Sequence, residues 1–197
     1  MYAYIEGKLA LKEATHVIVD VQGVGYEIKI SLNTYAAIKN AEKSRLFTYL
    51  HVKEDAHTLY GFVAIEEKEL FLYLISISGV GPGTALMVLS SFPADELRAA
   101  ITTENVKAIQ SVKGIGAKTA QRIILELKDK ILKSDYVSKS DIFPSQGYNT
   151  IQQEALSALT TLGINKAVAE KTVSTILKKS GPDISLEEVI KQALKSS

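Results

Sequence analysis

A glycine-containing pattern that occurs twice in the middle of the chain constrains the fold more than any other feature of the sequence. Residues 74–89 (LISISGVGPGTALMVL) align without gaps on residues 109–124 (IQSVKGIGAKTAQRII), at an offset of 35 residues. Both copies read apolar-x-x-apolar-x-Gly-apolar-Gly-x-x-x-Ala. Two copies in the same register indicate one structural unit that the chain uses twice.

Each copy of the repeat predicts a helix, a tight turn and a second helix. Glycine tolerates a positive φ and lets another backbone come close, so Gly79 and Gly81, with Gly114 and Gly116 in the second copy, fit the turn. A helix that starts there leaves its first N–H groups unpaired, and its dipole favours an anion at that end. Each unit therefore predicts a seat for a phosphate group that is built mainly from backbone.

Two familiar glycine motifs do not fit these residues. A P-loop requires G-x-x-x-x-G-K-[ST], but Ala117 precedes Lys118, and Val112 stands where the first glycine should be. The dinucleotide-binding motif G-x-G-x-x-G fails because Thr84 and Thr119 occupy the place of its third glycine. We therefore expect no nucleotide cofactor.

A pair of glycine-turn hairpins without any ligand is the plain alternative to a phosphate-binding unit. Charge favours binding at the second copy, where Lys113, Lys118 and Arg122 surround the turn. Lys118 and Arg122 are four residues apart and share one helix face. The whole chain has a formal net charge of only +1, so anion binding must come from this local cluster. These residues favour nucleic acid as the ligand.

The segment before the repeat is rich in β-structure, so the chain as a whole predicts an α+β multidomain protein. Alternating, β-branched and aromatic residues in 1–64 are typical of short strands. Strands with one helix fit a small OB-like β-barrel, although the pattern alone leaves other small barrels open. The expected strands span 15–21, 25–30, 44–53 and 57–62, and the expected helix spans 32–39.

Helical periodicity starts at residue 65, so residues 65–133 predict an all-α domain that contains the repeat. Residues 134–149 contain Ser, Asp, Pro and Gly with little periodicity, and they predict a flexible linker. Residues 150–197 predict a three-helix domain. Its local signals are a C-terminal glycine at Gly163, a cap at Asn165, and a capping box of Ser185 with Glu188.

Composition argues against several classes of protein. The 197 residues are 46% hydrophobic, which is enough for buried cores, but no apolar run reaches the ~18 residues that span a bilayer. The N-terminal region does not read as a secretory signal. With no cysteine there is neither a disulfide framework nor a thiolate metal site. We expect a cytoplasmic protein with no membrane partner.

Catalytic patterns are sparse. His16, His51 and His57 lie in expected strands without metal-ligand spacing, and no serine sits in a nucleophile elbow. No pair of carboxylates shows a clear acid–base arrangement. We therefore expect no catalytic residue, no metal and no cofactor.

Several motifs of the chain resemble those of a known family. SGVGPGTA (78–85) and KGIGAKTA (113–120) resemble tandem helix-hairpin-helix DNA-binding motifs. Together with VKEDAHTLYGF (52–62) and QGVGYE (22–27), they resemble the RuvA family, bacterial proteins that recognise Holliday junctions. The resemblance covers the whole chain and is weakest between residues 134 and 150. It implies a role in DNA recombination, DNA repair, DNA damage and the SOS response.

The resemblance also implies an assembly. The expected form is a homotetramer, or an octamer of two tetramers, whose four-fold symmetry suits a four-armed DNA junction. Its partners would be the junction, the RuvB motor ATPase and the RuvC resolvase. ATP hydrolysis during branch migration would belong to RuvB, so this chain would not be an enzyme by itself.

By resemblance, the two hairpins hold the DNA backbone of one arm. The implied residues are Gly79, Gly81, Gly83, Gly114, Gly116, Lys118, Thr119 and Arg122. Gly83 departs from the family pattern, which often has a lysine there. We therefore expect the second hairpin to contribute more than the first.

Two further sites follow only from the resemblance. Glu54 and Asp55 would form an acidic pin near the tetramer centre, whereas the residues alone favour an ordinary solvated turn. The C-terminal domain would dock the RuvB motor. The candidates for that contact are the exposed members of an apolar set that includes Leu156, Leu159, Leu162 and Ile176.

Other function classes stay open. A helix-hairpin-helix repair enzyme such as a glycosylase typically pairs one hairpin with a catalytic Asp or Lys, which the tandem copies and the barrel argue against. A general structure-specific DNA-binding adaptor fits the same motifs. A protein-interaction scaffold fits the near-neutral charge, and the salt dependence of junction affinity would separate it from a DNA-binding protein.

Overall fold

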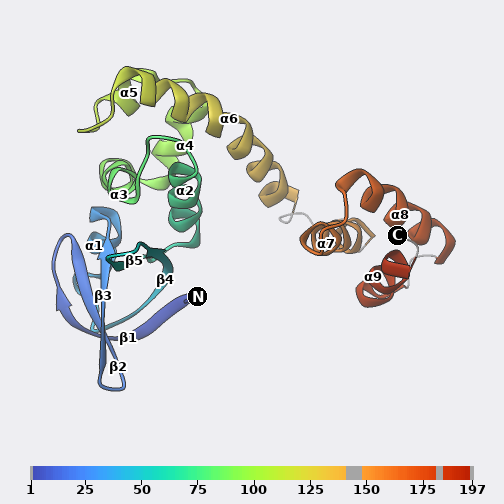
Figure 1. The fold of residues 1–197 in the computed structure, drawn as a ribbon, viewed down its shortest axis with the longest axis horizontal. Helices are drawn as coiled ribbons and strands as arrows, with labels where there is room; N and C mark the ends of the chain where they lie inside the picture. The colour runs from blue at the N-terminus through green and yellow to red at the C-terminus, as the bar shows by residue number, and fades with distance from the viewer. Residues whose placement is uncertain (1, 141–147, 181–183, 196–197) are drawn as a thin grey trace. The chain divides into compact units, whose positions relative to one another are not determined.

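The computed structural model describes residues 2–140, 148–180 and 184–195. The chain divides into two compact units, Met1–Tyr136 and Val137–Ser197. The first unit contains a β-barrel followed by a group of helices, and the second contains three helices (Figure 1).

The barrel consists of five strands and one helix: β1 Tyr4–Lys12, β2 His16–Val21, β3 Val24–Ile30, α1 Leu32–Ile38, β4 Lys43–Val52 and β5 His57–Phe62. The strands close in the order β1-β2-β3-β5-β4. Neighbours are antiparallel except β3 and β5, which pair in parallel. A closed five-stranded barrel with a helix between β3 and β4 confirms the expected OB-like fold. Strand β1 was not among the strands expected from the sequence.

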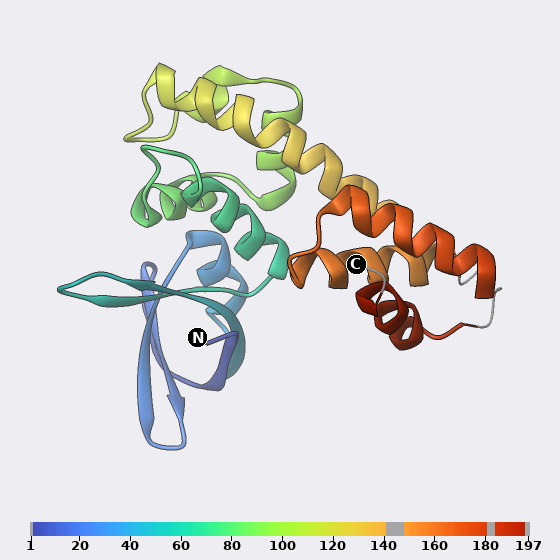
Figure 2. The ribbon, with the colours of Figure 1, turned by 45° about the vertical axis from the view of Figure 1, so that its right-hand side comes forward.

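Two turns shape the barrel. Gln22 and Gly23 connect β2 to β3 with φ values of +53° and +91°, as a type I′ hairpin turn requires. The second turn, between β4 and β5, extends well beyond the barrel (teal in Figure 2). The strands β1 and β2 lie so close at Gly7 that a Cβ on this residue would be 2.2 Å from the carbonyl oxygen of Asp20.

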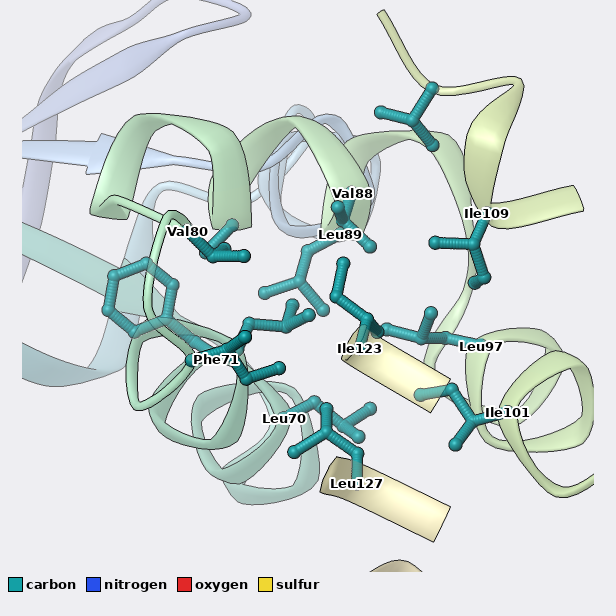
Figure 3. Close-up of a cluster of buried hydrophobic side chains, with 14 of the residues drawn as sticks. Leu70, Phe71, Val80, Val88, Leu89, Leu97, Ile101, Ile109, Ile123 and Leu127 are labelled. Carbon is teal, nitrogen blue, oxygen red and sulfur yellow. The ribbon is translucent and has the colours of Figure 1, made fainter. Parts of the chain in front are cut away.

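Five helices follow the barrel in the first unit: α2 Ile65–Ile75, α3 Pro82–Ser91, α4 Ala94–Thr102, α5 Val106–Gln110 and α6 Ala117–Ser140. Their apolar side chains meet in one buried cluster (Figure 3). The cluster also includes Tyr60 and Phe62 of β5, and the ring of Phe62 lies 4.9 Å from that of Phe71 in α2. The barrel and the helices therefore share a continuous core.

Polar contacts also fasten the barrel to the helices. The Nδ2 of Asn33 in α1 donates to the carbonyl oxygens of Leu89 and Phe92, at 2.6 and 2.9 Å, where α3 ends. These bonds use carbonyl groups that a helix C-terminus leaves unpaired. The position of α3, and of the hairpin before it, is thus tied to the barrel.

The helix α6 differs from the expectation. It runs to Ser140, so the first seven residues of the expected linker, 134–140, are helical. The physical reason is that no Gly or Pro occurs between residues 117 and 143, and the helix meets no strong breaker there. The rest of the expected linker lies almost wholly outside the described residues.

The second unit consists of α7 Tyr148–Thr161, α8 Lys166–Ser180 and α9 Leu186–Lys195 around its own buried core. The predicted local signals are present. Gly163 has a φ of +90° after α7, Asn165 accepts from the N–H of Ala167, and Ser185 accepts from the N–H of Glu188. Among the described residues, no helix is both long and apolar enough to cross a membrane.

Candidate nucleic-acid interface

The first hairpin joins α2 to α3. Gly79 has a φ of +91°, in the left-handed region that favours glycine. The N–H of Val80 donates to the carbonyl of Ile77 at 3.0 Å, and the Val80 side chain is buried in the helical core. Gly81 then caps α3 in an extended conformation, and Pro82 takes a first-turn position, where a missing N–H donor costs nothing.

The second hairpin joins α5 to α6 and repeats this geometry. Gly114 has a φ of +89°, and the N–H of Ile115 donates to the carbonyl of Val112 at 3.1 Å. The N–H of Ala120 donates to the carbonyl of Gly116 at 2.9 Å, the same length as the equivalent bond in the first hairpin. The sequence repeat is therefore also a repeat of backbone conformation and hydrogen bonding.

The hairpin glycines fall into two groups. At Gly79 and Gly114, the backbone has a positive φ, which favours glycine over other residues. Gly81, Gly83 and Gly116 lie outside that region, and a Cβ on any of them would meet no protein atom within 4 Å. Among the described residues, no neighbouring atom requires glycine at these three positions. Their bare backbone instead leaves room for a ligand to come close.

Unpaired backbone donors lie beside this open surface. In each copy, the first N–H of the following helix to find a backbone acceptor belongs to Ala85 or Ala120. Earlier amides have no backbone acceptor within the described chain: those of Gly83 and Thr84 in the first copy, and those of Ala117, Lys118 and Thr119 in the second. With the positive end of the helix dipole, such donors suit an oxyanion.

The cations of the second hairpin differ in their contacts with the rest of the protein. Lys113 and Lys118 are exposed, and neither is in an ion pair with a described residue. Arg122 is turned toward the first hairpin, where its Nη1 donates to the carbonyl oxygen of Ser78 at 3.1 Å. Its Nε also lies 3.6 Å from Oε1 of Glu126. Two nitrogen atoms of the Arg122 guanidinium thus contact the protein, while the side chain stays half-exposed. Its expected contact with DNA stays a prediction.

The two hairpins differ in charge although their backbones match. At the offset of 35 residues, each cation of the second copy has an uncharged equivalent in the first: Ser78 for Lys113, Gly83 for Lys118 and Met87 for Arg122. Side-chain charge for an anion is therefore concentrated at the second hairpin.

Two carboxylates lie together at the tip of the β4–β5 hairpin. The last strand pair is Val52 with His57, so Glu54 and Asp55 fall in the loop between them, and both are exposed. Neither forms an ion pair with any residue that the structure describes. Both carboxylates therefore face solvent without a paired cation among the described residues.

Among the described residues, no three His, Asp or Glu side chains gather closely enough to hold a metal ion. The histidines that the sequence drew attention to, His16, His51 and His57, all lie in barrel strands.

Family models match three parts of the chain. The RuvA N terminal domain matches residues 1–61, the SAM-like helix-hairpin-helix tandem matches residues 71–129, and the RuvA C-terminal domain matches residues 150–197. The middle match contains both hairpins.

Full-length relatives agree with these matches. A protein from Cytophaga hutchinsonii, named Holliday junction branch migration complex subunit RuvA, is 58% identical over 199 residues, and the alignment covers 100% of both chains. The chain belongs to the RuvA family. RuvA proteins of the same name from Amoebophilus asiaticus and Christiangramia forsetii are each 50% identical, over 99% of this chain and 100% and 99% of theirs.

In the C-terminal RuvA domain, burial separates the residues that a partner could contact from those in the core. Leu159 and Ile176 belong to its buried core, with 0% and 8% of their surface exposed, so they are not among the exposed members of the set that were the candidates. Leu156 is half-buried against that core. Leu162 is 60% exposed beside Gly163, which leaves it as the accessible member of the set.

Three residues near the hairpins were missed from the sequence: Ser78, Met87 and Glu126. Ser78 contributes through its carbonyl group, which any residue possesses, so its letter carries no signal. Met87 could have been found, because the repeat offset places it opposite Arg122. Glu126 could also have been found, since it lies four residues after Arg122 on the same helix.

Proposed function

We propose that this chain is the DNA-binding subunit of a branch-migration complex that recognises four-way (Holliday) junctions in recombination and DNA repair. The observation that supports this most is the pair of matching hairpins, each with an open glycine surface and unpaired amides. The shared name of its full-length relatives points to the same substrate. A function in the SOS response stays a prediction.

In this proposal each hairpin holds the sugar-phosphate backbone and not the bases. The amides of Gly81, Gly83 and Thr84, and those of Gly116, Lys118 and Thr119, have no backbone acceptor among the described residues, and they donate to phosphate oxygens. The side chains of Lys113 and Lys118 add charge at the second hairpin. Backbone contacts of this kind position DNA without reading its sequence, as a protein that acts on junctions of any sequence requires.

The assembly is also part of the proposal. A homotetramer would give each arm of the junction one pair of hairpins, and an octamer would add a second tetramer on the opposite face. The chain would recruit the RuvB motor, which hydrolyses ATP, and would share the junction with the RuvC resolvase. It would act in the cytoplasm and have no catalytic site of its own.

Two surfaces would serve that assembly. Glu54 and Asp55 would meet their copies near the centre, where 4 × 2 carboxylates repel phosphates by ~1 kcal/mol for each close pair in water. Such repulsion would hold the crossover open and guide strands as they exchange. In the C-terminal domain, the exposed Leu162 would be a contact for RuvB.

The glycine surfaces provide the test. Gly81→Val and Gly116→Val should lower the stability by no more than about 1 kcal/mol, because valine is a poorer residue than glycine at a helix N-cap but its Cβ meets no protein atom. We expect junction affinity to fall at least tenfold in each variant, because the valine occupies the space where the phosphate binds. Gel-shift titration with a synthetic four-way junction measures this decrease.

The matched control is Gly114→Val, which should destabilise the fold itself, by about 1–3 kcal/mol, because valine is strained at its positive φ. Wild-type affinity for Gly81→Val and Gly116→Val in folded protein would contradict the proposal. Release of a base from damaged duplex would favour a repair enzyme instead. Binding that does not change with salt would favour a protein scaffold.

A further inference from the structure

The hydrogen bond from Arg122 to Ser78 connects the two hairpins across 44 positions of the chain. Arg122 lies on the first turns of α6, after the second hairpin, and Ser78 immediately precedes Gly79 in the first. The bond therefore ties the helix of one phosphate seat to the turn of the other.

The bonded carbonyl belongs to a peptide group that matters for binding. The carbonyl of Ser78 and the N–H of Gly79 are parts of one planar trans peptide, so they point in opposite directions. The N–H of Gly79 has no backbone acceptor in the described structure. Because Arg122 holds the carbonyl, this N–H points away from the Arg122 guanidinium, and Gly79 itself is exposed.

The repeat places a different residue at the equivalent site. Met87 in α3 corresponds to Arg122, and its terminal methyl lies 3.6 Å from the point where a Cβ on Gly114 would be. Met87 of the first copy thus contacts the turn of the second hairpin, and Arg122 of the second copy contacts the turn of the first. The two residues occupy the same position of the repeat. The contact is a shared feature of the paired units, and only Arg122 makes it with a hydrogen bond.

We propose that Arg122 is a positioning residue, which fixes the Ser78–Gly79 peptide so that the neutral first hairpin presents its N–H groups to DNA, and that it is not a phosphate ligand. This inference rests on the proposed function. The first hairpin has no cation of its own at the three equivalent positions. Its binding of DNA therefore depends on the direction of its backbone N–H donors. A turned peptide would present a carbonyl oxygen, which repels phosphate.

The charge of Arg122 supports the same role. Its guanidinium lies beside the carboxylate of Glu126, with Nε 3.6 Å from Oε1, so part of its charge is offset within the protein. Lys118 is on the same helix and has no such partner in the described part of the chain. The two cations should therefore contribute differently to the salt dependence of binding.

Arg122→Met and Lys118→Met form a matched pair for the test, since each removes one positive charge from α6. For a four-way junction, Lys118→Met should reduce the log–log salt slope by about 0.9 for each phosphate that the variant no longer neutralises. Arg122→Met, which copies the residue of the first repeat, should weaken binding about tenfold at an almost unchanged slope, because it removes a charged hydrogen bond within the protein and leaves every phosphate neutralised. Arg122→Lys retains a charged donor and should recover part of the affinity.

Amide exchange in the free protein gives a second measurement that needs no DNA. The N–H of Val80, which is bonded within the first turn, should exchange several times faster in Arg122→Met, while the N–H of Ile115 in the second turn should not change. Lys118→Met should affect neither. These amides can be followed separately by NMR.

The inference is overturned if Arg122→Met reduces the salt slope as much as Lys118→Met, if it leaves junction affinity unchanged, or if Val80 exchanges at the wild-type rate. The proposed function fails in a different way, through absence of salt-dependent junction binding by the wild-type chain. The amide exchange of Val80 is informative in both cases.

Discussion

Glu67 shows how one residue at the start of α2 joins the barrel to the helices that carry the hairpins. Its side chain is only 7% exposed. It accepts hydrogen bonds from the hydroxyls of Ser31 and Thr34 at the start of α1, the latter at 2.7 Å. The Thr34 hydroxyl in turn accepts from the N–H of Val63. All of these polar groups are paired, which makes their burial tolerable.

Burial raises the pKa of Glu67 above its ordinary value of 4.5, and the hydroxyls of Ser31 and Thr34 oppose this in part. The folded chain therefore binds this proton more tightly than the unfolded chain does. It follows that the contribution of Glu67 to stability decreases as the pH rises from about 4.5 through the raised pKa. Glu67→Gln should lose this pH dependence, as measured by urea unfolding between pH 4.5 and 8.

Thr34→Val is the comparison variant for this prediction. It removes a hydroxyl that favours the charged carboxylate, so it should make the decrease of stability with rising pH larger and not smaller. Parallel stability curves for the wild type and Glu67→Gln over that pH range would show that the Glu67 pKa is not raised.

At the scale of elements, the tip of the β4–β5 hairpin has two carboxylates, whereas the second helical hairpin has cations and the first has neither. Glu54→Lys with Asp55→Lys should tighten junction binding severalfold at low salt, because repulsion between carboxylates and phosphates is replaced by attraction. The same change should slow RuvB-driven branch migration, because the strands near the crossover would be held. Gel shifts and a strand-exchange assay measure the two effects.

Asp95→Lys with Glu96→Lys is the matched control for the pin. These two acids are also adjacent and exposed, but they lie at the start of α4. If this pair produced the same changes as the substitutions at the pin, the effect would come from overall charge and not from the position of Glu54 and Asp55.

On the scale of the whole molecule, the barrel and the hairpins form one unit, whereas the C-terminal helices have a core of their own. A chain of residues 1–140 should therefore bind a four-way junction within about twofold of the full-length affinity. It should give little or no RuvB-driven branch migration, because it lacks the domain that we propose to contact the motor. Mixing in residues 148–197 as a separate chain should not restore migration, since the connection between the units would be absent.

The local features of both hairpins could be predicted from the sequence. Gly79 and Gly114 adopt the positive φ that the repeat implied, Val80 and Ile115 are buried between the helices, and Gly163 ends α7. Such features depend on residues a few positions apart, where backbone sterics and short hydrogen bonds decide the conformation. The end of α6 was misjudged because Ser and Asp are only weak helix breakers.

The tertiary structure alone decided how distant segments meet. It closed the barrel through β1 and through the parallel pair of β3 with β5, it buried Leu159 and Ile176, and it turned Arg122 toward Ser78. The sequence around an exposed arginine after a glycine turn is the same whether the side chain contacts a phosphate or a carbonyl group. Which of these it meets depends on the packing of α2 against α3 and α6, and that packing comes from a core assembled over the whole first unit.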